Sequence, residues 1–204
     1  MGTRKWYETT GERDLCSPDW LHFYSDPLVG MFLNPIHANI KNPRLFRVKV
    51  EGKGLDDHGL KCGYSRAKLI KELTVPQISS VQRVRFAILC AKKVYKEKEW
   101  NKWANNWLSG KDRTEESAAI VAYAAESVAY AAESTASTAK SAESAFYATK
   151  SAMIAFYAAK STMITFYVAE SAENAVESAV ESASITTKSK KIDLIRIAQK
   201  AMEE

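Results

Sequence analysis

Residues 114–204 contain no Gly, Pro, Cys, His or Trp. Gly and Pro interrupt helices most strongly, so their absence favours an uninterrupted helix over this tail. Residues 1–113 are the opposite case, because they hold all five Trp, all five Pro and all eight Gly. This contrast predicts a turn-rich globular head followed by a helical tail.

Cysteine is scarce as well: the chain has three, Cys16, Cys62 and Cys90, with no Cys-x-x-Cys pair. An odd number without a metal-type spacing predicts reduced thiols in a cytosolic protein. Cys90 lies in the apolar run Phe86–Ala91, which predicts a position in the core.

Two further absences limit the function. No apolar run approaches the ~20 residues that span a bilayer, and no apolar stretch follows the N-terminus, so we expect a soluble protein with no membrane partner. The Gly-rich phosphate loop and the Gly-x-Ser-x-Gly and His-Glu-x-x-His patterns are also missing. We therefore expect no enzymatic activity, no catalytic residue and no cofactor.

The two parts of the chain differ in charge. Residues 114–204 carry eight Lys/Arg and twelve Asp/Glu, and the whole chain carries 29 and 24, which leaves 21 and 12 in residues 1–113. A basic head suggests an anionic partner such as nucleic acid, a nucleotide or an acidic protein, although such a charge also serves solubility.

Turn residues and alternation predict the first elements of the head. Asp26-Pro27 is a typical helix start, and Asn34-Pro35 should end that helix. Leu45–Glu51 alternates apolar and charged residues, which predicts a half-buried strand that runs into a turn at Gly52–Gly54. We expect a second strand at Lys68–Val75.

Two helices should follow the strands. Ser79 and Gln82 have the spacing of a capping box and open a helix over 79–95. Lys98–Ser109 should form the next helix, which Gly110 ends. Sheet and helices together predict an α+β fold for the head, residues 1–113.

Each of these helices presents a candidate surface. The first carries basic residues that would face water and could hold the phosphates of an anionic partner, or could be an ordinary solvated face: Arg83, Arg85, Lys92 and Lys93. The second carries a tryptophan stripe that could anchor an interface, or could pack in the core against the sheet or the start of the tail: Trp100, Trp103 and Trp107.

Polar residues of the head suggest other sites. A pocket for a nucleotide or an enzymatic reaction would need His22, Tyr24, His37 or Arg44 to converge. The histidines, including His58, could bind metal with Cys16 or Cys62, but their spacing matches no zinc pattern, so we predict no metal. Asp56-Asp57 beside His58 could hold a cation, and turn chemistry explains the same residues equally well.

The tail, residues 114–189, repeats a charged residue followed by Ser. From Glu126 to Lys188 the gaps are 3, 4, 7 or 10 residues. The mean period of about 3.4 residues is close to the 3.5 of a left-handed supercoil, which predicts a long Ala-rich helix. Its aromatic residues keep the same register and should pack against other helices, in an oligomeric coiled coil or in a hairpin or bundle: Tyr123, Tyr130, Phe146, Tyr147, Phe156, Tyr157, Phe166 and Tyr167. The lack of Gly and Pro favours the straight form.

Residues 190–204 should form a short amphipathic helix that closes the chain. Its apolar residues are Ile192, Leu194, Ile195, Ala198 and Met202.

Several segments of the head resemble an uncharacterised family encoded by phages, prophages and bacteria, in which such a head precedes an Ala-rich tail of varying length. The segments are residues 21–28 (LHFYSDPL), 34–40 (NPIHANI), 42–45 (NPRL), 83–90 (RVRFAILC) and 103–113 (WANNWLSGKDR). The resemblance covers essentially the whole chain. It implies an intracellular setting, the cytoplasm of a bacterial host cell during phage infection. It brings no known activity, so it assigns no catalytic residue.

These observations lead to three hypotheses. The first is a non-catalytic interaction protein that oligomerises through its tail and binds a host or phage macromolecule through its head, as a counter-defence or host-takeover inhibitor. The second is a nucleic-acid-binding protein that uses the helix over 79–95. The third is a small nucleotide-binding or enzymatic head.

Overall fold

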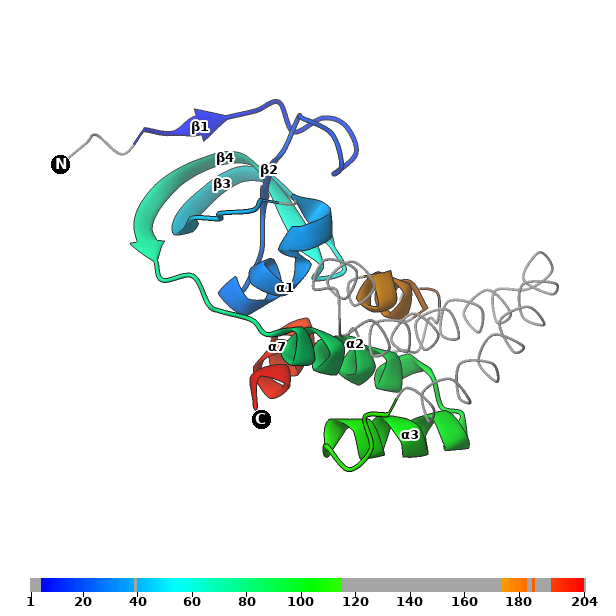
Figure 1. The fold of residues 1–204 in the computed structure, drawn as a ribbon. Coiled ribbons are helices and arrows are strands. Elements are labelled where there is room, and N and C mark those ends of the chain that lie inside the picture. Colours follow the sequence, from blue (N-terminus) through cyan, green and yellow to red (C-terminus); the bar gives the residue numbers. More distant parts are fainter. Residues whose placement is uncertain (1–4, 39, 115–173, 183–184, 186–191, 204) are drawn as a thin grey trace. The chain divides into compact units, whose positions relative to one another are not determined.

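The computed structural model describes residues 5–38, 40–114, 174–182, 185 and 192–203. The chain divides into two compact units, an N-terminal unit Met1–Gln77 and a C-terminal unit Ile78–Glu204. The N-terminal unit holds an antiparallel sheet and one helix, and the described elements of the C-terminal unit are helices (Figure 1). The predicted α+β class is therefore confirmed, whereas the predicted head, residues 1–113, spans the division between the units.

The sheet is built around one long strand, β4 (Lys61–Leu73). Along one edge of β4 lies β3 (Leu45–Asp57), and along the other lie the short strands β1 (Tyr7–Glu8) and β2 (Leu21–Phe23), all antiparallel to β4. β1 and β2 consist of two and three residues, which is too short for a periodic sequence signal. Of the predicted strand segments, Leu45–Glu51 lies wholly within β3, whereas Lys68–Val75 lies within β4 only as far as Leu73.

The turn predicted at Gly52–Gly54 is wrong. β3 continues through these residues to Asp57, and its register with β4 shifts between Glu51 and Gly54, as in a β-bulge. Gly52 has φ +84°, and a Cβ atom there would lie 2.3 Å from the Ser65 hydroxyl, so glycine serves a bulge here and not a hairpin turn.

The hairpin turn between β3 and β4 lies at His58 and Gly59 instead. Both have positive φ, +48° and +90°, and the Asp56 carboxylate accepts a hydrogen bond of 2.8 Å from the Gly59 amide. The acidic pair Asp56-Asp57 therefore takes part in turn formation, which is the turn-chemistry alternative of the sequence analysis.

Helix α1 (Pro27–His37) begins as predicted. The Asp26 carboxylate accepts hydrogen bonds from the Leu28 and Val29 amides, at 2.8 and 3.4 Å. The predicted end at Asn34-Pro35 is wrong, because a proline in the last turn removes only one intrahelical hydrogen bond. The helix ends two residues later, where the Asn34 carbonyl accepts from the Ala38 amide at 3.1 Å.

The C-terminal unit starts with α2 (Ser80–Val94), for which the predicted capping box is confirmed: the Ser79 hydroxyl accepts from the Gln82 amide, and the Gln82 side chain accepts from the Ser79 amide. All residues of Phe86–Ala91 are buried. Such a segment is enclosed on every side, and α2 contacts both α3 (Lys98–Leu108) and α7 (Leu194–Met202). Cys90 is fully buried as predicted, and burial raises the pKa of its thiol.

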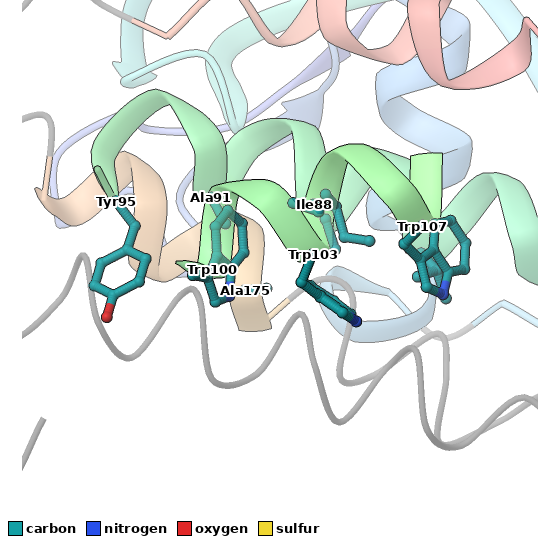
Figure 2. Close-up of a cluster of buried hydrophobic side chains, with 10 residues drawn as sticks. Ile88, Ala91, Tyr95, Trp100, Trp103, Trp107 and Ala175 are labelled. Carbon is teal, nitrogen blue, oxygen red and sulfur yellow. The ribbon is translucent and has the colours of Figure 1, made fainter. Parts of the chain in front are cut away.

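The core of this unit is built by α3. Trp100, Trp103 and Trp107 are 1%, 4% and 2% exposed and pack with residues of α2 (Figure 2). The Tyr95 and Trp100 rings meet edge to face, with centroids 5.5 Å apart. Gly110 has φ +74°, which confirms its predicted place at the end of α3.

Ala175, from the end of the tail, belongs to the same core. Ala175 packs with the tryptophans of α3, which ends six residues before Thr114. The choice between a straight helix and a hairpin or bundle falls on residues 115–173, which lie outside the described residues. Residues 174–182 are helical, as predicted for this part of the tail. The eight aromatic residues of the predicted packing stripe, from Tyr123 to Tyr167, lie outside the described residues.

The amphipathic helix predicted at the end of the chain is α7. Its buried residues are Leu194, Ile197, Ala198 and Ala201, a helical stripe of i, i+3, i+4 and i+7. Leu194 and Ala198 are among the predicted apolar residues, whereas Ile197 and Ala201 are not. Because α7 contacts α2, this helix is part of the C-terminal unit. None of the described helices is long and apolar enough to cross a bilayer.

Candidate macromolecule-binding surface

Two of the four basic residues predicted to form a face of α2 are bonded to α3 within the chain. Arg85 is half-buried and donates a hydrogen bond of 2.8 Å to the Leu108 carbonyl at the end of α3. Lys92 donates to the Asn105 side chain, also on α3. Burial, followed by repulsion from Lys200 and Lys96, lowers the pKa of Lys92. The expectation that these two cations face water is wrong, because they join α2 to α3.

The remaining cations of this helix do not restore the predicted surface. Lys93 is exposed, and Arg83 is half-buried with interactions of its own. Lys96, just beyond the helix, donates a 2.6 Å hydrogen bond to the Lys92 carbonyl. Of the four candidate residues, only Lys93 thus stands fully exposed.

The tryptophan stripe is buried in a core as the packing alternative expects, but its partners are not the expected sheet or the start of the tail. It packs with α2 and Ala175, in a core that contains no strand residue. The three indoles therefore present almost no exposed surface that could anchor a partner.

The polar residues proposed for a pocket take part in separate local contacts. Arg44 donates two hydrogen bonds of 2.8 Å to the Glu72 carboxylate and lies over the Phe46 ring. These hydrogen bonds hold the pKa of Glu72 below its usual range. His22 contacts the Leu15 carbonyl, and Tyr24 lies against Gly30.

Among the described side chains, the remaining histidines add no residue to a shared pocket. His58 forms the β3–β4 turn, and the side chain of His37 lies outside the described ones. In the described part of the chain, no three His, Cys, Asp or Glu side chains gather as metal ligands. Cys16 is exposed and accepts a hydrogen bond of 3.1 Å from Lys61, whereas Cys62 is half-buried beside the Phe23 carbonyl.

A different basic surface, which the sequence analysis missed, lies on one face of the sheet. The cations Arg66, Lys68 and Lys49 surround the half-buried Trp6 ring, at 4.3, 4.7 and 5.9 Å from its centroid. The strand register explains this gathering, because Lys49 pairs with Lys68 and Glu51 with Arg66, and directly paired residues share a face. We call this surface the basic sheet face: Trp6, Glu8, Arg47, Lys49, Glu51, Arg66, Lys68 and Lys71.

Two carboxylates partly neutralise this face. Arg66 pairs with Glu8 at 2.8 Å and with Glu51 at 3.3 Å, and Lys49 pairs with Glu51 at 2.8 Å. A hydrogen bond from Lys49, with the nearby positive charges, lowers the pKa of Glu51, so this carboxylate stays ionised at neutral pH. Arg47 and Lys71, both exposed, pair with each other across the strands. Five cations against two carboxylates leave the face positive.

The sequence predicts the charged side of each strand of this face, but not how the strands pair. Arg47, Lys49 and Glu51 alternate with valines, and Arg66 and Lys68 flank Ala67, so each segment predicts charge on one side of a strand. The pairing of the two segments, together with Trp6, depends on the register and on β1, and neither can be read from periodicity.

The basic sheet face thus brings five cations of β3 and β4 together, of which Arg47, Lys49 and Lys71 are exposed. The predicted resemblance to phage-encoded proteins receives no support or contradiction from other proteins. Comparison of the chain with models of protein families, with curated proteins and with solved structures gives no match.

Proposed function

We propose that the protein is a non-catalytic, phage-type interaction protein that binds a host or phage macromolecule through its N-terminal unit. The observation that supports this proposal is the basic sheet face, where cations stand on an exposed strand surface around Trp6. The hydrogen-bonded ladder holds the backbone of these residues in place, so binding has to order only their side chains. The role in counter-defence or host takeover, in the cytoplasm of a bacterial host, rests on the sequence resemblance.

Two alternatives have less support. Binding of nucleic acid through the helix over 79–95 would use Arg85 and Lys92, whose polar groups already bond to α3. A nucleotide-binding or enzymatic head would use Arg44, whose guanidinium is held by Glu72.

Comparative capture tests the proposal. The full-length chain and two charge-matched variants, Arg47→Gln/Lys71→Gln on the basic sheet face and Lys102→Gln/Lys111→Gln on exposed lysines of the C-terminal unit, are used as bait in host and infected-cell extracts. We expect the first variant to lose a partner that the native chain and the second variant retain. Identical partner sets for all three baits would contradict binding through this face.

Association through the tail stays part of the proposal. The predicted packing residues, from Tyr123 to Tyr167, would then meet copies of themselves. Light scattering coupled to size exclusion on the full chain should give a multiple of 22.8 kDa. A mass that remains monomeric up to the highest soluble concentration would remove oligomerisation from the proposal without affecting the basic sheet face.

A further inference from the structure

Part of the sheet is a two-stranded ribbon. β1 and β2 pair with β4 only at Ala67 and earlier residues, whereas β3 pairs with β4 as far as Leu73. Among the described strands, residues 45–49 and 68–73 therefore have only each other as partners. Figure 1 shows β3 and β4 running together as one long curved ribbon.

The charges on this ribbon are arranged against its own stability. Arg47 lies directly opposite Lys71, and Lys49 lies directly opposite Lys68. Opposite charges in such positions stabilise an antiparallel pair, whereas like charges destabilise it. Within the described part of the chain no ion pair neutralises Arg47, Lys68 or Lys71, whereas Lys49 pairs with Glu51 at 2.8 Å, so the Arg47–Lys71 pair is the one without an ion-pair partner on either side.

Repeated unfavourable pairs at one place indicate a function, because local rules of stability are broken most often where binding requires it. Along a strand, two residues span about 7 Å, so the two like-charged pairs form one compact block. A partner that places several anions next to this block would relieve both repulsions on binding. Duplex DNA is such a partner, with one charge per ~1.7 Å of its axis.

The shape of the ribbon and the character of its basic face favour DNA over an acidic protein. A two-stranded β-ribbon fits the major groove of B-form DNA, whereas the major groove of A-form RNA is too narrow. The core of a protein interface is usually depleted of charge and enriched in exposed aromatic residues. On this face Trp6 is half-buried among Arg66 and Lys68, whereas the exposed residues Arg47, Lys49 and Lys71 are all cations.

We propose that the four cations of the ribbon, Arg47, Lys49, Lys68 and Lys71, dock on the phosphates of duplex DNA, with the ribbon along the major groove. This inference rests on the proposed function, since it names the partner class of the same face. If each cation contacts one phosphate, the logarithm of the binding constant falls with the logarithm of salt with a slope of about −3.6. Binding then weakens roughly 150-fold between about 50 and 200 mM salt.

Fluorescence anisotropy of a labelled DNA duplex of about 20 base pairs, titrated with the full chain over this salt range, measures the slope. The variant Arg47→Gln/Lys71→Gln should bind at least tenfold more weakly at low salt, with a slope of about −1.8. The control Lys102→Gln/Lys111→Gln changes the net charge equally and should bind as the native chain does.

Lys71→Glu provides a test that loss of folding cannot mimic. It replaces a repulsive pair with an attractive one, so it should melt no lower than the native chain while its DNA affinity falls further than that of Lys71→Gln. No salt-dependent binding by the native chain, or equal losses in the ribbon and control variants, would overturn the DNA proposal.

The outcomes separate the two proposals. If the ribbon variant loses a captured acidic protein and the native chain does not bind the duplex, the face is an interaction surface and its assignment to DNA is wrong. If the ribbon variant captures the same partners as the native chain and binds DNA unchanged, the proposed function fails together with the inference.

Discussion

The C-terminal unit and the β3–β4 ribbon of the N-terminal unit place basic residues in contrasting surroundings. In the C-terminal unit, Arg85 and Lys92 extend from α2 to polar groups of α3 and hold two helices together. In the N-terminal unit, Arg47 and Lys71 face each other across a strand pair, where they weaken the sheet. A count of basic residues therefore says little about an anionic partner until those bonded within the chain are set apart.

The largest effect should come from truncating the tryptophan core. Trp100→Ala removes a side chain that is 1% exposed, and we expect a loss of about 3–5 kcal/mol in the free energy of unfolding. The matched change in the other unit, Trp6→Ala, removes a half-buried ring held by cation–π contacts and should cost about 1 kcal/mol. Denaturant unfolding followed by circular dichroism measures both. Equal losses would contradict the contrast between a buried and a surface tryptophan.

Arg85→Met should have the next largest effect. Methionine preserves much of the aliphatic stem but cannot donate to the Leu108 carbonyl, and a hydrogen bond to a charged group contributes about 1.5–3 kcal/mol. We expect the free energy of unfolding to fall by an amount near the lower end of this range, because Arg85 is half-buried. DNA affinity should not change. A variant that kept full stability but lost DNA binding would reverse the roles assigned to the two units.

Glu97 caps α3 and gives a pH-dependent prediction. Its carboxylate accepts from the Trp100 and Glu99 amides, and these hydrogen bonds lower its pKa. The stabilisation is therefore present above the ordinary pKa of a glutamate and is lost as the pH falls through the lower folded-state pKa. Glu97→Gln should destabilise the chain by about 1 kcal/mol at neutral pH and progressively less in acid. Unfolding curves from neutral to acid pH test this, and a constant difference would argue against the cap.

Lys71→Glu should cause the smallest change in stability, and it is the only variant expected to raise the free energy of unfolding. Turning the pair with Arg47 into an attractive one should stabilise the N-terminal unit by about 0.2–1 kcal/mol. The shift of the unfolding midpoint relative to Lys71→Gln isolates the charge from the side-chain length. A destabilised Lys71→Glu would mean that the native pair is not repulsive and would weaken the functional interpretation of the ribbon.

Local signals of the sequence are sufficient for the starts of α1 and α2 and for the end of α3. Asp26, the Ser79–Gln82 box and Gly110 all act as predicted, because a cap depends on residues only two to four positions apart. The buried face of α3 follows from tryptophans three and four residues apart.

Features that depend on residues distant in the sequence could not be predicted. The glycines at 52 and 54 predict a turn, but the pairing of β3 with β4 places a bulge there, with Gly52 against Ser65. The bonds from Arg85 and Lys92 to α3 required the helix packing to be known. Predicting the basic sheet face requires the register of three strands, because a one-residue slip would move the side chains of a strand to the other face.

The position of Ala175 affects how the chain can change over time. Both boundaries of residues 115–173 adjoin one core, since α3 precedes them and Ala175 packs on α3. The described contacts of this core are made by α2, Tyr95, α3 and Ala175. We therefore expect variants that differ in the number of charged repeats between Thr114 and Ala175 to keep the tryptophan core.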